Sequence, residues 1–306
     1  MEQLLVHMEQ ELVGQRQNVR LLIAALLAGG HVLLEGVPGI GKTKMVRTLS
    51  GLIGGESKRV QFTPDMMPSD IIGHVVFNMH HNRFETVKGP VFANLLLADE
   101  INRTPPKTQS ALLEAMEERQ VTIQGVTYPL PEPFFVVATQ NPVEYEGTYV
   151  LPEAQLDRFL FKLTMQYPSL EHERQILRQH VRSQDSQSVA TEPVCSLDDL
   201  LSERKRLDEV VVDDTIIDYI TTLIRKTRET QRLVLGASSR AGIAVLQASK
   251  AWALLDNRMY VTPDDVKMVA RPALRHRLVL APQAEMEGGT SDHIIDETLA
   301  AIPVPR

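Results

Sequence analysis

The chain has 306 residues, which is enough for one large domain or two domains of ordinary size. Its 32 lysines and arginines against 39 aspartates and glutamates give a net charge of −7, which argues against nonspecific nucleic-acid binding over the whole surface but leaves room for a local basic channel. The single cysteine excludes an intrachain disulfide, and the acidic N-terminus MEQLLVHMEQEL has no apolar core of a signal peptide. The longest apolar run, 21–28, is far shorter than the roughly 20 residues of a membrane span, so we expect a cytoplasmic protein.

The first half of the sequence alternates between strand-like and helix-like patterns. Runs that are apolar on both faces, such as 94–100 and 134–139, are typical of central parallel strands. The predicted strands cover 31–35, 59–62, 94–100, 134–139 and 160–163. The predicted helices around them cover 1–12, 15–28, 45–53, 107–118 and 152–158. This alternation predicts an α/β fold with a parallel five-stranded sheet and helices on both faces.

Two antiparallel hairpins interrupt the alternation. The first is predicted over 75–87, around a turn at 78–82. The second is predicted over 120–129, around the turn residues Gln124 and Gly125. The prolines and aspartates of 63–73 predict a loop just before the first hairpin.

The composition changes near the middle of the chain. Helix patterns take over from strand patterns, so we expect a core domain over 1–167 and a small all-α domain over 168–306. A polar segment at 183–196 predicts a flexible linker, and Asp213 and Thr262 are expected N-caps. The predicted helices of this half cover 170–180, 197–207, 214–227, 239–255 and 263–275.

Glycines join the first predicted strand to the helix that follows it. The stretch HVLLEGVPGIGKT, residues 31–43, has the order G-x-x-x-x-G-K-T between strand and helix, which is the context that a phosphate-binding loop requires. Backbone N–H groups can approach phosphate oxygens there, and the helix N-terminus adds unpaired donors. Lys42 would reach the β and γ phosphates of a nucleotide, and the Thr43 hydroxyl would hold Mg²⁺. The residues expected to bind the nucleotide are Gly36, Val37, Pro38, Gly39, Ile40, Gly41, Lys42, Thr43 and Lys44.

Polar residues follow two more predicted strands at their carboxyl ends, where parallel sheets bind ligands. Asp99 ends the run LLLADE and would join Thr43 in holding Mg²⁺, while Glu100 would orient and deprotonate the attacking water. Asn141 follows the strand VVAT, where it would contact the γ-phosphate or that water. Without the phosphate loop, the same residues are better explained as a pair of solvated acids and a turn.

The chain resembles the MoxR family of AAA+ ATPases over residues 13–280. The resemblance rests on the blocks HVLLEGVPGIGKT, QFTPDMMPSDIIG, KGPVFANLLLADEINR, KTQSALLEAMEERQVTI, VVATQNPVEYEGTY, LPEAQLDRF and GASSRA. It implies a P-loop AAA+ core with a helical lid, and ATP and Mg²⁺ as ligands. It also implies that Lys42 and Thr43 belong to Walker A, and that Asp99 and Glu100 are the Walker B acids.

The same resemblance implies roles for three further residues. Asn141 corresponds to sensor 1, Arg158 to an arginine finger offered to a neighbour's ATP, and Arg240 to sensor 2. Apart from the family, Arg158 and Arg240 suit ordinary surface arginines. Many relatives have a proline at the position of Ser239, so the helix that carries Arg240 begins less rigidly in this chain.

The two predicted hairpins match the helix-2 insert and the pre-sensor-1 insert of the family, which face the central pore of a ring, usually a hexamer. Members are thought to act as chaperones that assemble or activate other proteins, often with metal cofactors, and their usual partners carry von Willebrand A domains. We find no such domain in this sequence and expect a separate partner protein. Met66, Met67 and the two hairpin tips are apolar or polar rather than basic, so we expect protein and no nucleic acid in the pore.

Three other functions stay open at this point. A magnesium-chelatase-type motor subunit shares the inserts and would also need a metal-insertion partner. A DNA translocase shares them too, although the acidic composition opposes it, and its ATPase would respond to DNA with steep salt dependence. A scaffold that binds ATP without turnover is opposed by the intact Glu100.

Overall fold

The computed structural model describes residues 1–37, 39–141, 147–184 and 193–305. Contacts between Cα atoms divide the chain into two compact units. The first unit comprises Met1–Val19, Leu33–Leu151 and Thr164–Leu200. The second unit comprises Arg20–Val32, Pro152–Leu163 and Leu201–Arg306. The functional domain boundary expected after residue 167 stays a prediction.

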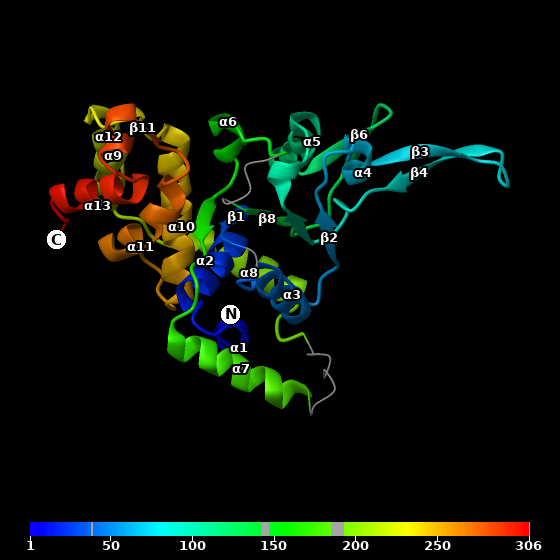
Figure 1. Ribbon diagram of the computed structural model, residues 1–306. Helices are drawn as coiled ribbons and strands as arrows, with labels where there is room; N and C mark the ends of the chain where they lie inside the picture. The colour runs from blue at the N-terminus through cyan, green and yellow to red at the C-terminus, as the bar shows by residue number, and fades with distance from the viewer. Residues whose placement is uncertain (38, 142–146, 185–192, 306) are drawn as a thin grey trace. The chain divides into compact units, whose positions relative to one another are not determined.

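The main sheet has five strands in the spatial order β2-β5-β8-β1-β9 (Figure 1). They are β1 (Val32–Glu35), β2 (Ser57–Gln61), β5 (Leu95–Asp99), β8 (Phe135–Gln140) and β9 (Phe161–Thr164). Strand β5 pairs in parallel with β2 on one side and β8 on the other. Every residue of β5 is buried, as expected for an apolar central strand. The predicted fold class, a five-stranded parallel sheet with helices followed by a helical region, is confirmed.

Helices cover both faces of the sheet in the first unit. In Figure 1, α3 (Lys42–Ile53) and α5 (Pro106–Glu118) lie on opposite sides of the strands β2 and β8. The buried residues of each helix recur at helical spacing, so each helix presents one apolar face to the sheet. The chain also forms α1 (Glu2–Glu11), α2 (Arg16–Leu27), the 3-10 turn η1 (Ile101–Arg103) and α8 (Leu197–Arg206).

Two helices of the first unit differ from the prediction. The segment 63–73, predicted as a loop, contains the short helix α4 (Pro68–Ile72). A proline suits the first turn of a helix, and Asp70 Oδ2 accepts the Met67 N–H at 2.8 Å, so local capping forms a helix that the sequence pattern does not reveal. Helix α7 (Leu170–Gln184) runs past its predicted end, and part of the predicted linker lies outside the described residues.

Both predicted hairpins are confirmed. They consist of β3 (Gly73–Asn78) with β4 (Arg83–Lys88), and of β6 (Gln120–Ile123) with β7 (Val126–Pro129). Phe77 pairs with Phe84 across the first hairpin, with ring centroids 5.2 Å apart, although the two residues are 49% and 75% exposed. The Thr86 and Tyr128 hydroxyls lie 3.0 Å apart and join the two hairpins. The first hairpin therefore contacts the second hairpin through Thr86 and carries an exposed aromatic pair farther along its strands.

The base of the β3–β4 hairpin is built from two glycines. Gly73 has a φ of 101°, and a Cβ at this position would lie 2.3 Å from the carbonyl oxygen of Val87. A Cβ on Gly89 would lie 2.2 Å from the carbonyl oxygen of Ile71. Since the backbones meet directly, larger residues at either position would force the two chain segments apart.

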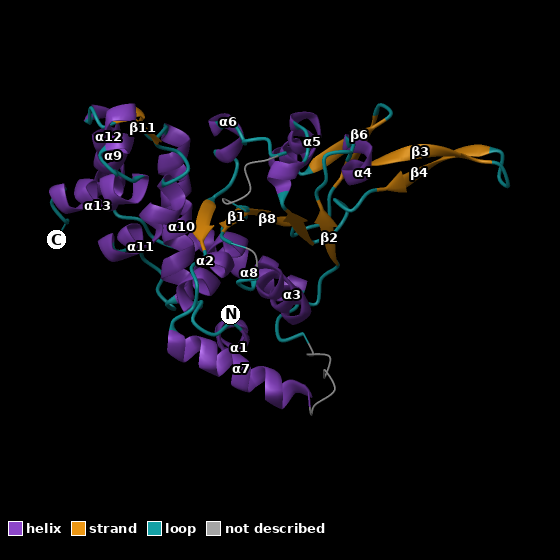
Figure 2. Cartoon of the chain, viewed as in Figure 1, coloured by secondary structure: helices purple, strands orange, loops and turns teal. Residues whose placement is uncertain are grey.

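The second unit is largely helical, as the purple ribbons of Figure 2 show. Its helices are α6 (Glu153–Leu156), the 3-10 turn η2 (Leu207–Glu209), α9 (Asp214–Glu229), α10 (Ser239–Leu255), α11 (Pro263–Leu274), α12 (Pro282–Met286) and α13 (Ser291–Ala301). The N-caps predicted at Asp213 and Thr262 are confirmed, because each side chain accepts a hydrogen bond from the first turn of its helix. In the described ranges of the chain, no helix is long and apolar enough to cross a membrane.

Two predictions for this unit are wrong. Helices were expected alone after residue 197, but β10 (Leu233–Leu235) pairs antiparallel with β11 (Val279–Leu280). The predicted helices end at residue 275, but the chain from Pro282 forms two more, α12 and α13. The Thr290 hydroxyl caps α13, and its buried residues Ile294 and Ile295 are adjacent in the sequence, so they do not mark the period of a helix.

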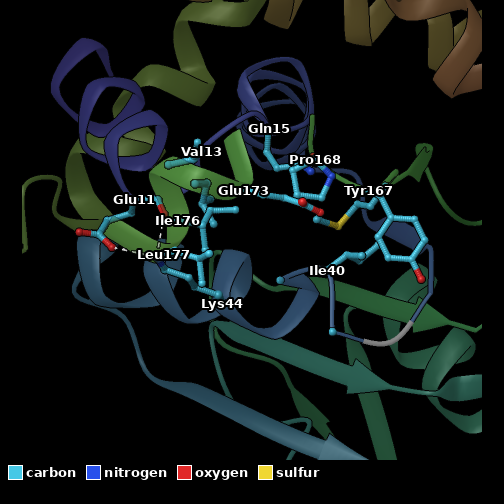
Figure 3. Close-up of a pocket in the computed structure, with 14 residues that line it drawn as sticks. Glu11, Val13, Gln15, Ile40, Lys44, Tyr167, Pro168, Glu173, Ile176 and Leu177 are labelled. Atoms are coloured by element: carbon cyan, nitrogen blue, oxygen red, sulfur yellow. Dashed lines mark hydrogen bonds and ion pairs between the residues drawn. The ribbon is translucent and has the colours of Figure 1, made fainter. Parts of the chain in front are cut away.

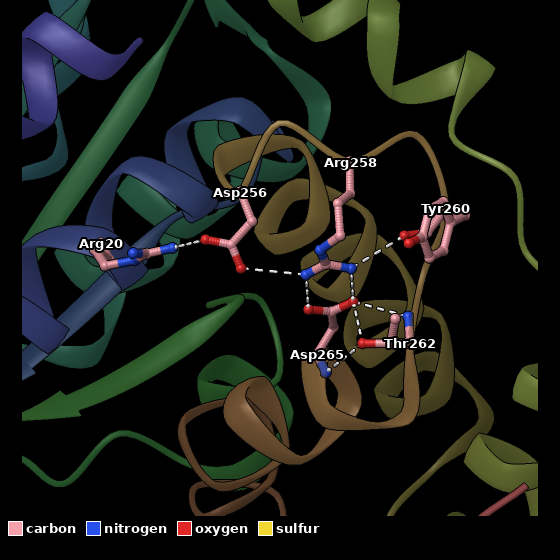
Figure 4. A network of polar contacts seen from close by, with 6 residues as sticks. All are labelled: Arg20, Asp256, Arg258, Tyr260, Thr262 and Asp265. Atoms are coloured by element: carbon pink, nitrogen blue, oxygen red, sulfur yellow. Dashed lines mark hydrogen bonds and ion pairs between the residues drawn. The ribbon is translucent and has the colours of Figure 1, made fainter. Parts of the chain in front are cut away.

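A polar cluster around Arg258 joins several segments of the second unit (Figure 4). The Arg258 guanidinium donates to both carboxylate oxygens of Asp265, at 2.8 and 2.5 Å, and to Asp256 Oδ2 at 3.1 Å. The Thr262 N–H and hydroxyl both donate to Asp265 Oδ2 at 2.8 Å, and Arg20 donates to Asp256. These donors hold the buried Asp265 at the start of α11. The hydrogen bond to Asp265, followed by the contact with Asp256, raises the pKa of Arg258.

Candidate functional site

The loop between β1 and α3 is the centre of the candidate site. Gly39 and Gly41 adopt left-handed backbone conformations with φ of 83° and 94°, and Gly41 is the N-cap of α3. Only glycine enters this region without a steric penalty, so the loop turns its backbone in a way that other residues would resist. Pro38, within the same loop, lies outside the described residues.

Lys42 lies at the first turn of α3 and is 9% exposed. Its Nζ donates to the carbonyl oxygen of Gly36 at 2.6 Å and to that of Gln140 at 3.3 Å. The Gly36 N–H also donates to the Gln140 carbonyl, at 3.4 Å. The ammonium group is therefore held where β1 and β8 end, beside the buried Asn141 that follows Gln140.

The acids after β5 are joined by a threonine on β8. Thr139 donates its hydroxyl hydrogen to Asp99 Oδ1 at 2.6 Å, and the Glu100 N–H donates to the same hydroxyl oxygen at 2.9 Å. Glu100 has a φ of 57°, a left-handed conformation that is costly for a residue with a Cβ. Such strain is typical of residues that a functional site holds in place.

Strand β2 contributes partners that sequence reasoning missed. Arg59 donates to Asp99 Oδ2 at 2.8 Å, and Gln61 Nε2 donates to Glu100 Oε2 at 2.7 Å. Arg103 forms a further ion pair with Glu100 Oε2 at 3.0 Å. Gln61 lies beside Asp99 in the parallel pairing of β2 with β5, and Arg59 is the next residue of β2 on the same face. This proximity can be seen only once the strand order is known.

A cavity of about 530 Å³ adjoins the loop within the first unit (Figure 3). Two segments far apart in the sequence, within 11–15 and 165–177, line it together with Gly39, Ile40, Gly41 and Lys44 of the loop and helix. The remaining lining residues are Glu11, Leu12, Val13, Gln15, Met165, Tyr167, Pro168, Glu173, Ile176 and Leu177. Its size and mostly apolar lining are those of small-molecule sites. Sequence reasoning missed it because no local motif marks these segments.

Lys44 contributes to the cavity wall, but its side chain has other partners. Nζ donates to the Glu11 carbonyl oxygen at 2.7 Å and pairs with Glu11 Oε2 at 3.3 Å. Its ammonium group therefore ties α3 to the end of α1. Among the predicted nucleotide-binding residues, Lys44 has a side chain that points to Glu11 at the end of α1.

Arg158 and Arg240, the other predicted site residues, belong to the second unit. Arg158 follows α6, where its N–H donates to the Gln155 carbonyl oxygen at 3.3 Å. Arg240 lies in the first turn of α10, with Nε 3.8 Å from Asp157 Oδ2. Asp157 thus lies between the two predicted arginines, next to one in sequence and near the other in space.

The residues of the first unit suit a nucleotide with a divalent cation. The left-handed glycines at the N-terminus of α3 and the Lys42 ammonium group form a donor set for phosphate. The Thr43 hydroxyl and the Asp99 carboxylate are oxygen ligands of the kind that Mg²⁺ prefers. The apolar cavity next to this set has room for an aromatic base.

Comparisons with known proteins agree with this arrangement. The family model for the ATPase family associated with various cellular activities (AAA) matches residues 31–161, and that for the AAA lid domain matches residues 225–298. The chain is 50% identical to the uncharacterized protein YeaC of Bacillus subtilis, over 98% of this chain and 93% of that protein. It is 43% identical to the chaperone MoxR1 of Mycobacterium tuberculosis, over 100% of this chain and 82% of that protein.

The structure also resembles a solved one. A crystal structure of a putative ATPase from Cytophaga hutchinsonii superposes with a TM-score of 0.91 and 42% sequence identity, covering 100% of this chain and 94% of that chain. Sequence and fold therefore agree over nearly the whole length of these relatives. The chain belongs to the MoxR family of AAA+ ATPases.

Proposed function

We propose that this chain is a Mg²⁺-dependent ATP hydrolase, with residues 1–167 as its nucleotide-binding core and 168–306 as its lid. It works as a subunit of a homo-oligomeric ring, a hexamer, in the cytoplasm. Its output is the remodelling or activation of partner proteins, including the insertion of a metal cofactor. One observation supports the ATPase most directly: the Lys42 ammonium group lies at the end of β8, the strand whose Thr139 holds both Asp99 and Glu100.

The phosphate loop binds the nucleotide through its backbone and one cation. The N–H groups of residues 36–44 contact phosphate oxygens, and Lys44 takes part through its main chain because its side chain binds Glu11. Lys42 leaves its two carbonyl partners for the β and γ phosphates. Thr43 and Asp99 hold Mg²⁺, which when bound neutralises charge on the same phosphates.

Glu100 is the general base. Its carboxylate takes a proton from the water that attacks the γ-phosphorus, and the bond from that phosphorus to the β–γ bridging oxygen breaks. Gln61 and Arg103 hold Oε2, while the strained backbone fixes the direction of the side chain. Asn141 orients the γ-phosphate or the water from the end of β8. Arg240 acts as sensor 2.

The 530 Å³ cavity receives the adenine base. It shares Gly39, Gly41 and Lys44 with the phosphate loop, so a nucleotide whose phosphates lie on the loop would extend its base toward the apolar lining. Adenine buries a flat apolar face and needs few polar contacts, which matches a lining dominated by aliphatic side chains.

The phosphate-loop assignment is tested by Lys42→Ala, with Lys58→Ala as a matched control. Lys58 lies on β2 and pairs with Glu56 at 3.1 Å, outside the site. We expect Lys42→Ala to abolish binding of a fluorescent ATP analogue in titrations with Mg²⁺, while Lys58→Ala binds like the wild type. Equal affinity in wild type and Lys42→Ala would refute the assignment, and turnover that survives removal of divalent cations would refute the Mg²⁺ requirement.

The ring assignment predicts that hydrolysis per subunit rises with protein concentration. Arg158 would reach the γ-phosphate of a neighbouring subunit, and such fingers contribute about 10³- to 10⁵-fold in rate. Mixing Arg158→Ala with Lys42→Ala subunits should therefore restore activity, since each retains what the other lacks. Rings of the mixed variants that form in sedimentation experiments but stay inactive would contradict a finger that acts in trans.

The partner is expected to be a protein, most directly a separate one with a von Willebrand A domain. The first hairpin exposes Phe77, Met79 and Phe84, and Met67 precedes it at 62% exposure. Flexible and aromatic apolar side chains suit variable protein segments, whereas a channel for nucleic acid would be basic.

A pull-down with Glu100→Gln in ATP and in ADP tests this partner. A protein retained only in ATP, and lost with Met66→Ser plus Met67→Ser, supports the proposal. Val234→Ser is the matched control, because it removes an apolar side chain that is 69% exposed in the second unit. Recovery of DNA alone, displaced by salt, would make the chain a translocase; an ATP-dependent metal-chelatase partner would favour the chelatase-type motor.

A further inference from the structure

Asp157 in the second unit is bound by an arginine that the proposed mechanism does not use. Arg277, which follows α11, donates from Nε to Asp157 Oδ1 at 2.5 Å. The other carboxylate oxygen, Oδ2, lies 3.8 Å from Nε of Arg240. One carboxylate therefore faces two arginines, which come from α10 and from the end of α11.

Arg277 also holds the main chain on both sides of Arg158. Its Nη2 donates to the carbonyl oxygens of Asp157 at 3.1 Å and Phe159 at 2.8 Å, and its Nη1 donates to that of Leu160 at 3.1 Å. His276 adds a contact from Nε2 to the Phe159 carbonyl oxygen at 3.0 Å. The main-chain carbonyl groups before and after Arg158 are thus held by two buried side chains, those of Arg277 and His276.

The guanidinium group is suited to this task in a way that an ammonium group is not. It presents five N–H donors in a rigid plane, and here it contacts a carboxylate and several carbonyl oxygens at once. The Arg277 side chain is only 4% exposed. A change in its direction would therefore move the backbone that carries Arg158, since water has little access to replace the lost donors.

We propose that Arg277 is a positioning residue for Arg158, and that Asp157 links this position to Arg240. The proposal rests on the finger role of Arg158 in the proposed function. Because misplacing a reacting group by about 1 Å can cost about 10²-fold, loss of the Arg277 contacts should slow hydrolysis by about that factor while ATP affinity in the same subunit is retained.

Mixed rings provide the test. Arg277→Met should lose about 10²-fold in turnover, bind the fluorescent ATP analogue like wild type, and regain activity when mixed with Lys42→Ala subunits. Mixed with Arg158→Ala it should gain nothing, because both variants lack the same function. Arg258→Met is the matched control: it removes another largely buried arginine from the same unit and should leave turnover per folded subunit unchanged.

Two more variants distinguish a positioning role of Arg277 from a merely structural one. Asp157→Asn keeps the side-chain volume and an oxygen that can accept from Arg277, so a folded variant can be measured, and its turnover per folded subunit should fall. In the double variant Arg158→Ala with Arg277→Met, turnover should equal that of Arg158→Ala alone. Full turnover in a folded Arg277→Met or Asp157→Asn protein, or a double variant whose loss is the product of the single losses, would overturn the proposal.

Failure of the finger itself gives a different pattern. If Arg158→Ala does not complement Lys42→Ala, the trans role in the proposed function is wrong. The comparison of single and double variants still decides whether Arg277 acts through Arg158.

Discussion

Two buried aspartates, one in each unit, have the same kinds of partners but different surroundings. Asp99 at the end of β5 pairs with Arg59 and accepts the Thr139 hydroxyl. Asp265 in α11 pairs with Arg258 and accepts the Thr262 hydroxyl. Residue type alone would assign both to one role.

The difference lies in where the partners come from. Asp265 and its threonine belong to one helix start, and Arg258 contacts both carboxylate oxygens in a fork. The partners of Asp99 come from two other strands, and the Arg59 side chain is 55% exposed. The Thr139 hydroxyl also accepts from the backbone N–H of the strained Glu100, so a second acid lies beside Asp99. The Asp265 cluster described above has no such second acid bound to its threonine. Bonding within one helix start is thus characteristic of a structural acid, whereas partners from separate strands and an exposed cation leave an acid available to a ligand.

The largest expected effect separates the two clusters by stability. Arg258→Met leaves Asp265 buried without its bidentate partner and should lower the free energy of unfolding by about 3 kcal/mol. Chemical denaturation measures this loss. The comparison fails if ATP turnover per folded subunit falls as well.

The opposite result is expected for Glu100→Gln. If Glu100 is the general base as proposed, its replacement should slow hydrolysis by at least about 10²-fold, which corresponds to about 2.7 kcal/mol in the barrier. The amide keeps the side-chain size, so denaturation should hardly change. A slow variant that also unfolds more readily would place Glu100 with Asp265 among structural acids.

A buried histidine in the second unit, His276, should make the stability of the protein depend on pH. Burial, followed by the positive charges of Arg277, Lys162 and Arg275, lowers the pKa of His276 well below its ordinary value of 6.5, while its contact with Phe159 opposes that shift. Below pH 6.5 the unfolded chain therefore binds a proton that the folded chain does not. Stability contributed by neutral His276 is present above this pH and should fall with acidification by up to about 1.4 kcal/mol per pH unit.

Denaturation of wild type and His276→Gln between pH 7 and pH 5 measures this contribution. The variant should lose less stability than wild type over that range, because glutamine does not titrate. Parallel curves for the two proteins would show that His276 is not the source of the acid sensitivity.

The two threonines that contact these aspartates should differ only slightly in stability but clearly in turnover. Thr139→Val and Thr262→Val each remove one hydroxyl, and each should cost about 1 kcal/mol of stability. Only Thr139→Val should also lower turnover, because Thr139 orients both Asp99 and Glu100. Equal turnover in the two variants would show that the hydroxyl between the acids has no part in catalysis.

The sequence reveals this site to the extent that its parts are local. The phosphate loop, the acids after β5 and both hairpins are visible because a motif or a strict alternation lies within a few residues. Arg59 and Gln61 are not, since their relation to Asp99 and Glu100 depends on β2 being the neighbour of β5. The cavity was missed for the same reason, because its walls combine α1, the phosphate loop and α7.

Short elements were lost for another reason. Helices α4 and α13 depend on caps at their starts rather than on a long apolar period, so a search for periodicity overlooks them. The roles of the site residues remain proposals that the variants above test.

The glycines at the base of the β3–β4 hairpin fix the backbone of the junction, whereas the side chains of the hairpin beyond it can vary. At Gly73 and Gly89 the close neighbours are all main-chain atoms, so the junction does not depend on which side chains follow it. Residues 74–88 form a module on this junction, and their contacts with the rest of the unit include the Thr86–Tyr128 hydrogen bond and the Lys88 ammonium group 4.8 Å from the centroid of the Phe92 ring. Transplanting this module between family members, with both glycines retained, would exchange the surface that is proposed to meet a partner protein without altering the residues that are proposed to hydrolyse ATP.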